Sequence, residues 1–125
     1  MTPLQQQFEI LKQQHPNATL EVLSTGASVI TIPEVLLGDG WSPPNAFVKF
    51  VAPVGYPFAT PDCFWASPDL RLKSGAMPQN TNLTPIPGTS TPLLWFSWHA
   101  SHWNPNRDNL LTYFRVIKER LKRAQ

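Results

Sequence analysis

The sequence predicts a single α+β domain over residues 1–125, with a helix at each end and an antiparallel sheet between them. Four observations lead to this prediction. Both ends of the chain carry apolar residues at helical spacing, and three alternating segments follow one another between short turns. The length of 125 residues suits one domain with a modest core. The 14 prolines favour corners and edge segments over long helices.

Residues 2–14 predict the N-terminal helix. Thr2 can cap it and Pro3 suits its first turn. The apolar residues of one face are Leu4, Phe8 and Leu11. Pro16 follows and ends the helix.

Residues 19–23, 28–37 and 46–51 predict three strands joined by short turns, which is the pattern of an antiparallel meander. Pro33 lacks a backbone N–H and therefore predicts an edge or a bulge in the second strand. Residues 63–65 predict a fourth strand, so the expected meander has about four strands.

Residues 74–91 are rich in Pro, Gly, Asn, Ser and Thr and predict a long loop. Loops of this length in a small domain are typically functional or mobile. The extended residues 93–99 follow, and then a final helix over residues 104–125. Asn104 is its predicted cap and Pro105 its first position.

The final helix has two contrasting faces. Its predicted buried stripe consists of Leu110, Phe114, Ile117 and Leu121. Its predicted outer face is basic and consists of Arg115, Lys118, Arg120, Lys122 and Arg123. This face is either a solvated surface or a track for phosphates.

Composition excludes several classes of protein. The net charge of +2 is too small to indicate a nucleic-acid partner. No apolar run is long enough to cross a membrane, and residues 1–14 do not resemble a signal peptide, so the cytoplasm is the expected location. Cys63 alone cannot form a disulfide framework, and His15, His99 and His102 form no recognisable metal set. We therefore expect no cofactor.

The motifs between the sheet and the final helix carry a family resemblance. The stretch YPFATPDCF (residues 56–64) and the Trp-x-Pro of residues 103–105 look like those of the ubiquitin-conjugating (UBC) fold. A narrower resemblance is to bacterial members of that superfamily, the prokaryotic family E type, and rests on PDCFW (61–65), PDLRLKSG (68–75) and residues 96–99. Such members are encoded beside ubiquitin-like proteins and ThiF-like activating enzymes, which the resemblance implies as partners.

The chain departs from the ubiquitin-conjugating pattern at the nucleophile. The family's thioester-forming cysteine lies before the Trp-x-Pro, near Trp95 in this sequence, where no cysteine is present. The family's His-Pro-Asn element is also absent. Cys63 falls on the strand before the loop and is expected to be a buried small hydrophobe.

Ser97 and His99 are the candidate catalytic residues, as nucleophile and base. On a strand, residues two apart share one face, so a hydroxyl–imidazole hydrogen bond is possible there. His102 is a second possible base and Asp108 a possible orienting carboxylate. The alternative is that Ser97 and His99 merely satisfy loop backbone groups.

Three tryptophans, Trp95, Trp98 and Trp103, form either a ligand surface or part of the core, and burial is the commoner role of large aromatics. The resemblance implies a component of a bacterial ubiquitin-like conjugation pathway, with antiphage defence as its setting. It is either an acyl carrier without the usual cysteine or a non-catalytic variant that positions modifier and activating enzyme. The alternative is a small basic nucleic-acid-binding adaptor.

Overall fold

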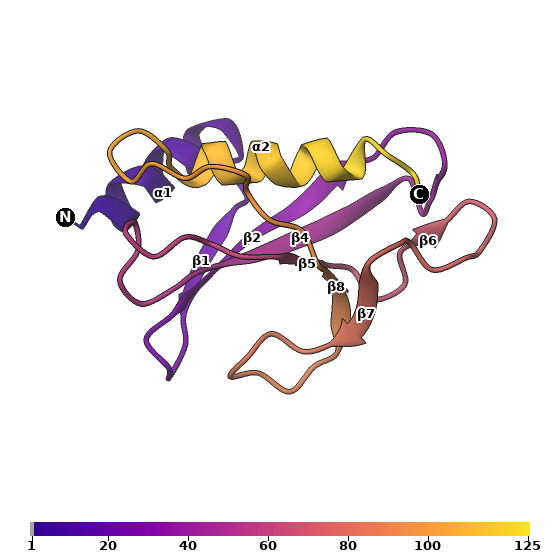
Figure 1. Ribbon diagram of the computed structural model, residues 1–125, viewed down its shortest axis with the longest axis horizontal. Helices are drawn as coiled ribbons and strands as arrows, with labels where there is room; N and C mark the ends of the chain where they lie inside the picture. The colour runs from indigo at the N-terminus through magenta and orange to yellow at the C-terminus, as the bar shows by residue number, and fades with distance from the viewer. Residues whose placement is uncertain (1) are drawn as a thin grey trace.

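A computed structural model describes residues 2–125 (Figure 1). The elements in chain order are α1 (Pro3–Gln14), β1 (Thr19–Val22), β2 (Ser28–Leu36), β3 (Trp41–Ser42), β4 (Asn45–Ala52), β5 (Phe64–Ala66), β6 (Arg71–Leu72), β7 (Thr81–Thr84), β8 (Leu93–Phe96) and α2 (Leu110–Leu121). The fold is α+β with a helix at each end, as predicted. Neither helix is long and apolar enough to span a membrane, within the described residues.

The main sheet has six antiparallel strands in the order β1-β2-β4-β5-β8-β7. Its first four strands form the predicted meander, but the prediction of about four strands was too low. The strand β7 lies inside residues 74–91, which composition predicted as loop. Nevertheless, Thr81 to Thr84 pair with β8, because pairing within a sheet can outweigh the local conformational propensity of the residues.

The second strand is interrupted where its proline predicts. The register between β2 and β4 shifts between Ile32 and Val35, around Pro33. Before the shift, Ile30 and Ile32 are buried in the main core, while Val29 belongs to a smaller cluster. The alternation of the sequence therefore divides β2 between two apolar layers.

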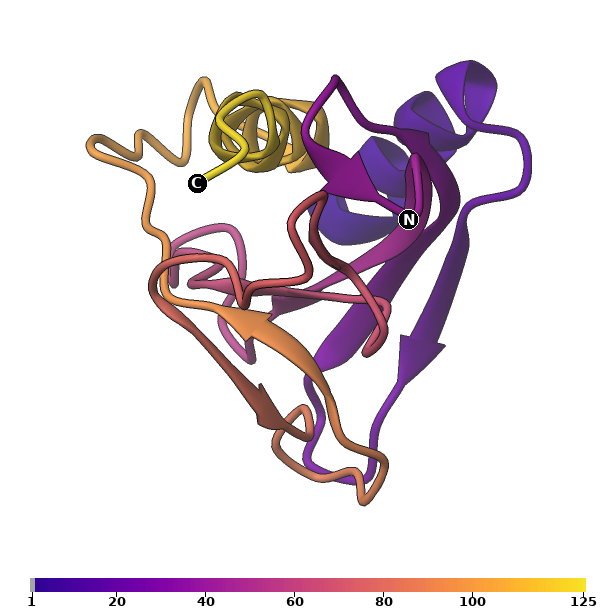
Figure 2. The ribbon, with the colours of Figure 1, turned by 90° about the vertical axis from the view of Figure 1, so that its right-hand side faces the viewer.

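Both helices lie on the same side of the sheet (Figures 1 and 2). The main core includes Leu11 of α1, Phe114 and Ile117 of α2, and residues of the sheet. Within it, the rings of Phe64 and Phe96 stack with their centroids 4.5 Å apart. The smaller cluster consists of Val29, Trp65, Ile86 and Leu93.

The helix α1 begins as predicted, with Thr2 as its cap, whose hydroxyl accepts from the backbone N–H of Gln5. The prediction that the last helix starts at Asn104 was wrong, because α2 begins at Leu110 and is capped by Asn109. Residues 104–108 instead form a turn in which the Asp108 carboxylate accepts from the Asn104 backbone N–H at 2.7 Å. The Asp108 side chain thus pairs with a backbone N–H nearby, and a closed turn forms here in place of the first turn of the helix.

The buried stripe of α2 is confirmed, since Leu110, Phe114, Ile117 and Leu121 are all buried. Arg120 was wrongly assigned to the outer face, because it is only 2% exposed. Its guanidinium donates to the backbone oxygens of Arg123, Gln79 and Gln125 at 2.9–3.0 Å. Burial is tolerated because these carbonyls replace water.

Candidate functional site

The Tyr-Pro motif of residues 56–64 and the Trp-x-Pro motif of residues 103–105 meet in space. The indole nitrogen Nε1 of Trp103 donates to the Pro57 carbonyl at 2.8 Å. The ring of Trp103 also lies 6.0 Å from that of Tyr56, and the Tyr56 hydroxyl is hydrogen-bonded to Gln7 of α1. The chain therefore leaves the neighbourhood of α1 at Tyr56 and returns to it at Trp103.

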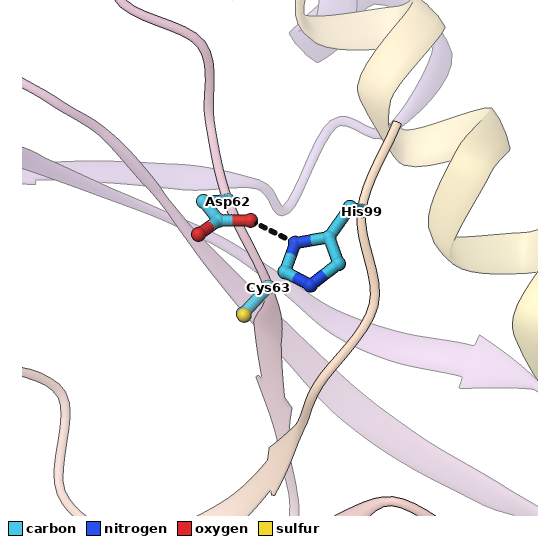
Figure 3. Close-up of side chains that lie close together, drawn as sticks. All are labelled: Asp62, Cys63 and His99. Atoms are coloured by element: carbon cyan, nitrogen blue, oxygen red, sulfur yellow. Dashed lines mark hydrogen bonds and ion pairs between the residues drawn. The ribbon is translucent and has the colours of Figure 1, made fainter. Parts of the chain in front are cut away.

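Between these points, pairing of β5 with β8 brings three reactive side chains together (Figure 3). Asp62 and Cys63 directly precede β5, and His99 follows β8. The Cys63 backbone N–H donates to the Trp98 carbonyl at 3.0 Å and extends the pairing beyond the strands. The His99 Nδ1 is hydrogen-bonded to Asp62 Oδ1. One donor atom from each of Asp62, Cys63 and His99 lies within 4.8 Å of the others, and we call this group the Asp62–Cys63–His99 cluster.

Cys63 has an unusual backbone and a shielded thiol. Its φ of 61° is in the left-handed region, which a residue with a side chain rarely adopts. Burial raises the pKa of the Cys63 thiol; hydrogen bonds from the Trp98 backbone and the Trp95 side chain act in the opposite direction, and Asp62 adds to the rise. The thiol is therefore protonated near neutral pH and needs a base or a metal ion to form the thiolate.

A mainly apolar cavity of about 420 Å³ lies beside the cluster, and its lining includes Asp62, Cys63, Trp65, Trp95, Val51 and Pro87. Trp65 is 6% exposed. Its Nε1 is buried and has no hydrogen-bond partner among residues 2–125. An unsatisfied buried N–H costs about 1–3 kcal/mol, so this indole lowers the stability of the fold beside the cavity.

The predicted residues Ser97 and His99 lie just beyond the end of β8, so the strand spacing assumed for them does not apply. Ser97 is partly buried and its backbone N–H donates to the Asn80 carbonyl at 2.9 Å. Both residues line one shallow depression with Asn80 and Trp98. His99 is exposed, and its ring is hydrogen-bonded to Asp62 rather than to the Ser97 hydroxyl.

The other predicted partners lie elsewhere. Asp108 is buried and holds the turn before α2, whereas His102 is exposed. Asp62 therefore orients the His99 ring in the place expected for Asp108. Sequence reasoning missed Asp62, although it stands next to the cysteine in the PDCFW motif, because its closeness to His99 depends on strand pairing.

Cys63 is 7% exposed, which confirms that it is buried. It is not part of either hydrophobic cluster, however. The resemblance places the family's cysteine near Trp95. Trp95 lies opposite Trp65 on the neighbouring strand and lines the same cavity as Cys63. The only thiol of the chain thus lies beside the expected position in space, although it is far from it in sequence.

The three tryptophans are partly buried. Trp98 and Trp103 pack against the main core, and Trp95 packs against the smaller cluster. The packing role is therefore the one the structure supports for these side chains.

Comparison with known protein families shows which family the chain belongs to. The model of prokaryotic E2 family E matches residues 5–124. The chain belongs to prokaryotic E2 family E. Membership gives it an E2-like role in a prokaryotic conjugation pathway, which involves modifier and activating enzymes in general. No curated protein and no solved structure matches the chain.

Proposed function

We propose that this member of family E has the UBC-like fold and accepts the C-terminal acyl group of a ubiquitin-like modifier at the Asp62–Cys63–His99 cluster. The observation that supports it is the grouping of a thiol, an imidazole and a carboxylate within 4.8 Å in a chain of an E2-like family. A ThiF-like activating enzyme is the proposed donor, the bacterial cytoplasm the proposed location, and antiphage defence the proposed setting.

The proposed step is a thioester exchange. The Cys63 sulfur attacks the carbonyl carbon that joins the modifier to a thiol of the activating enzyme. A new C–S bond forms, the bond to that enzyme breaks, and the Cys63 proton passes through His99 to the departing thiolate. Asp62 orients the imidazole through the hydrogen bond at Nδ1.

The cavity supports this step. It gives a buried thiol an approach from outside, because Cys63 is part of its lining. Its walls are mainly apolar and include Trp65 and Trp95, so they shield the reacting thioester from water.

Ser97 remains the proposed nucleophile of an alternative reaction, in which the acyl group is carried as an oxyester. Ser97 lines the same depression as His99, and acylation of its hydroxyl would give an oxyester. The hydrogen bond from His99 to Asp62 and the nearness of Cys63 to both favour the thioester.

The experiment combines the protein with a modifier, its activating enzyme and ATP, followed by a non-reducing gel. We expect an adduct that dithiothreitol cleaves, that Cys63→Ala abolishes and that Ser97→Ala retains. An adduct that resists dithiothreitol, yields to hydroxylamine and depends on Ser97 would assign the oxyester instead. A stable complex without any adduct would identify a non-catalytic protein that positions the modifier or the activating enzyme.

The nucleic-acid alternative is less well supported. Arg120, one of the five cations predicted for a basic outer face, is buried in the protein. Binding to DNA or RNA that weakens steeply with salt would favour this alternative.

A further inference from the structure

The Asp62–Cys63–His99 cluster also has the composition of a metal site. Thiolate sulfur, imidazole nitrogen and carboxylate oxygen are the three ligand types that proteins use for Zn²⁺. In a tetrahedral zinc site these ligand atoms lie about 3.3–3.8 Å apart, given bonds of about 2.0–2.3 Å to the metal. The donor atoms of the cluster lie within 4.8 Å of one another, which is close to this arrangement.

We propose that Asp62, Cys63 and His99 bind a Zn²⁺ ion as three protein ligands, with the fourth position open. The sequence alone gave no sign of such a site, because Cys63 and His99 are brought together only by the pairing of β5 with β8.

Charge and access fit a divalent ion. A Cys63 thiolate and the Asp62 carboxylate together balance the two positive charges of Zn²⁺. Asp62 and His99 expose 66% and 62% of their side chains, so an ion can reach them from solvent. The same exposure lets the carboxylate and the imidazole move apart at little cost to admit the ion, because exposed ion pairs contribute little to stability.

The backbone of Cys63 is held in place on both sides. Its N–H donates to the Trp98 carbonyl at 3.0 Å, and its carbonyl accepts from the buried Tyr113 hydroxyl at 2.8 Å. Groups that hold a ligand in place in this way increase metal affinity.

The proposed ion and the proposed acyl group require the same sulfur atom, so they exclude each other. Zinc binding itself does not rest on the proposed function, and it is measured without modifier, activating enzyme or ATP. A protein that binds zinc but forms no adduct, or the reverse, would therefore separate the two proposals.

The test is a titration of the full chain, reduced and freed of metal, with Co²⁺ as a coloured substitute for Zn²⁺. We expect saturation at one ion per chain, a near-ultraviolet band from charge transfer between thiolate and cobalt, and loss of that band when Zn²⁺ is added. Cys63→Ser should abolish the band. His99→Ala and Asp62→Asn should each weaken Co²⁺ and Zn²⁺ binding at least about tenfold, the lower range for removing a supporting group at a metal site. His102→Ala is the matched control, because His102 is exposed and lies outside the cluster.

Two results would overturn the proposal. One is the absence of saturable Co²⁺ or Zn²⁺ binding at millimolar concentration. The other is a thiolate band that is equally strong in His99→Ala and Asp62→Asn, which would indicate adventitious binding to the thiol alone. Circular dichroism of each variant identifies any loss of fold, and the two exposed side chains can be replaced without emptying the core.

Discussion

Arg120 illustrates at the scale of one residue how a charged side chain becomes part of the core. Its guanidinium lies 5.2 Å from the Phe96 ring and 5.9 Å from the Trp98 ring. Burial lowers the pKa of this guanidinium, and the nearby Arg123 lowers it further. The side chain connects α2 to Gln79 and thus to the segment that precedes β7.

We predict that Arg120→Met lowers the free energy of unfolding by about 1–3 kcal/mol, because the charge-assisted hydrogen bonds to three carbonyl oxygens are lost. Arg120→Lys should not restore it, since an ammonium group lacks the planar set of donors. Urea unfolding checks both variants. Arg115→Met, at an exposed position of the same helix, should change stability by no more than about 0.5 kcal/mol. Equal stability of the Arg120→Lys protein and the parent would contradict this role.

Only part of the candidate site could be predicted from single residues in the sequence. Residue types alone identified His99 as a candidate base, and composition correctly predicted that Cys63 is buried. The Asp62–His99 hydrogen bond could not be predicted from spacing. It depends on the register of β5 against β8, and register is a tertiary property.

At the scale of elements, the start of α2 shows how two similar caps compete. Asn104 and Asn109 both suit a helix cap, and the proline after Asn104 favoured the earlier start. Asp108 accepts from the Asn104 backbone and closes a separate turn there. The Asn109 side chain accepts from the Thr112 backbone N–H at 3.0 Å and begins the helix.

Asn109→Ala should therefore lower the free energy of unfolding by about 1 kcal/mol, the usual effect of removing a helix cap. Asn104→Ala is the matched variant and should have the smaller effect, because its side chain is exposed and serves only a local turn. Thermal or urea unfolding compares the two. A larger loss for Asn104→Ala would mean that the helix begins earlier than described.

The contact between α1 and α2 makes stability depend on pH through His15. His15 caps α1 through its backbone N–H, which donates to the Leu11 carbonyl, and its ring lies edge-on to the Phe114 ring with centroids 5.0 Å apart. Burial lowers the pKa of His15 below its ordinary value of 6.5, and the positive charge of Lys118 lowers it further. Between the lowered pKa and pH 6.5, the unfolded chain therefore binds more protons at His15 than the folded protein does.

It follows that the contribution of His15 is fully present above pH 6.5 and is lost as the pH falls through the lowered pKa. We expect His15→Gln to reduce the fall in unfolding free energy between neutral and mildly acidic pH. His102→Gln should leave that fall unchanged, because His102 is exposed. Urea unfolding at several pH values measures both variants. An unaltered pH profile for His15→Gln would refute the assignment.

For the whole molecule, local patterns correctly predicted that a helix lies at each end, and they predicted the first four strands of the sheet, although α2 begins later than expected. Alternation placed Ile30 and Ile32 in the core, and helical spacing placed Phe114 and Ile117 there. The position of β7 was not predictable in this way, because Thr81 to Thr84 carry no apolar alternation and are held by pairing with β8. Strand order beyond a meander depends on long-range contacts that local patterns do not contain.

The interior position of β8 can be tested by its packing. Leu94 is fully buried and lies opposite Ala66 of β5 and Leu83 of β7. We predict that Leu94→Ala lowers the free energy of unfolding by about 2–5 kcal/mol through the cavity it leaves. Leu36→Ala, at a position 80% exposed, should change it by about 0.5 kcal/mol or less. A small effect at Leu94 would place β8 at an edge of the sheet.

The strand order has a consequence for the newborn polypeptide. During translation β5 and β7 emerge before β8, although β8 lies between them in the finished sheet. A ribosome must therefore release the chain beyond Phe96 before the gap closes, and until then both neighbours present unpaired backbone to the cell. Asp62 and Cys63 are also synthesised before His99. A truncated chain that ends before β8 therefore forms neither the complete sheet nor the Asp62–Cys63–His99 cluster.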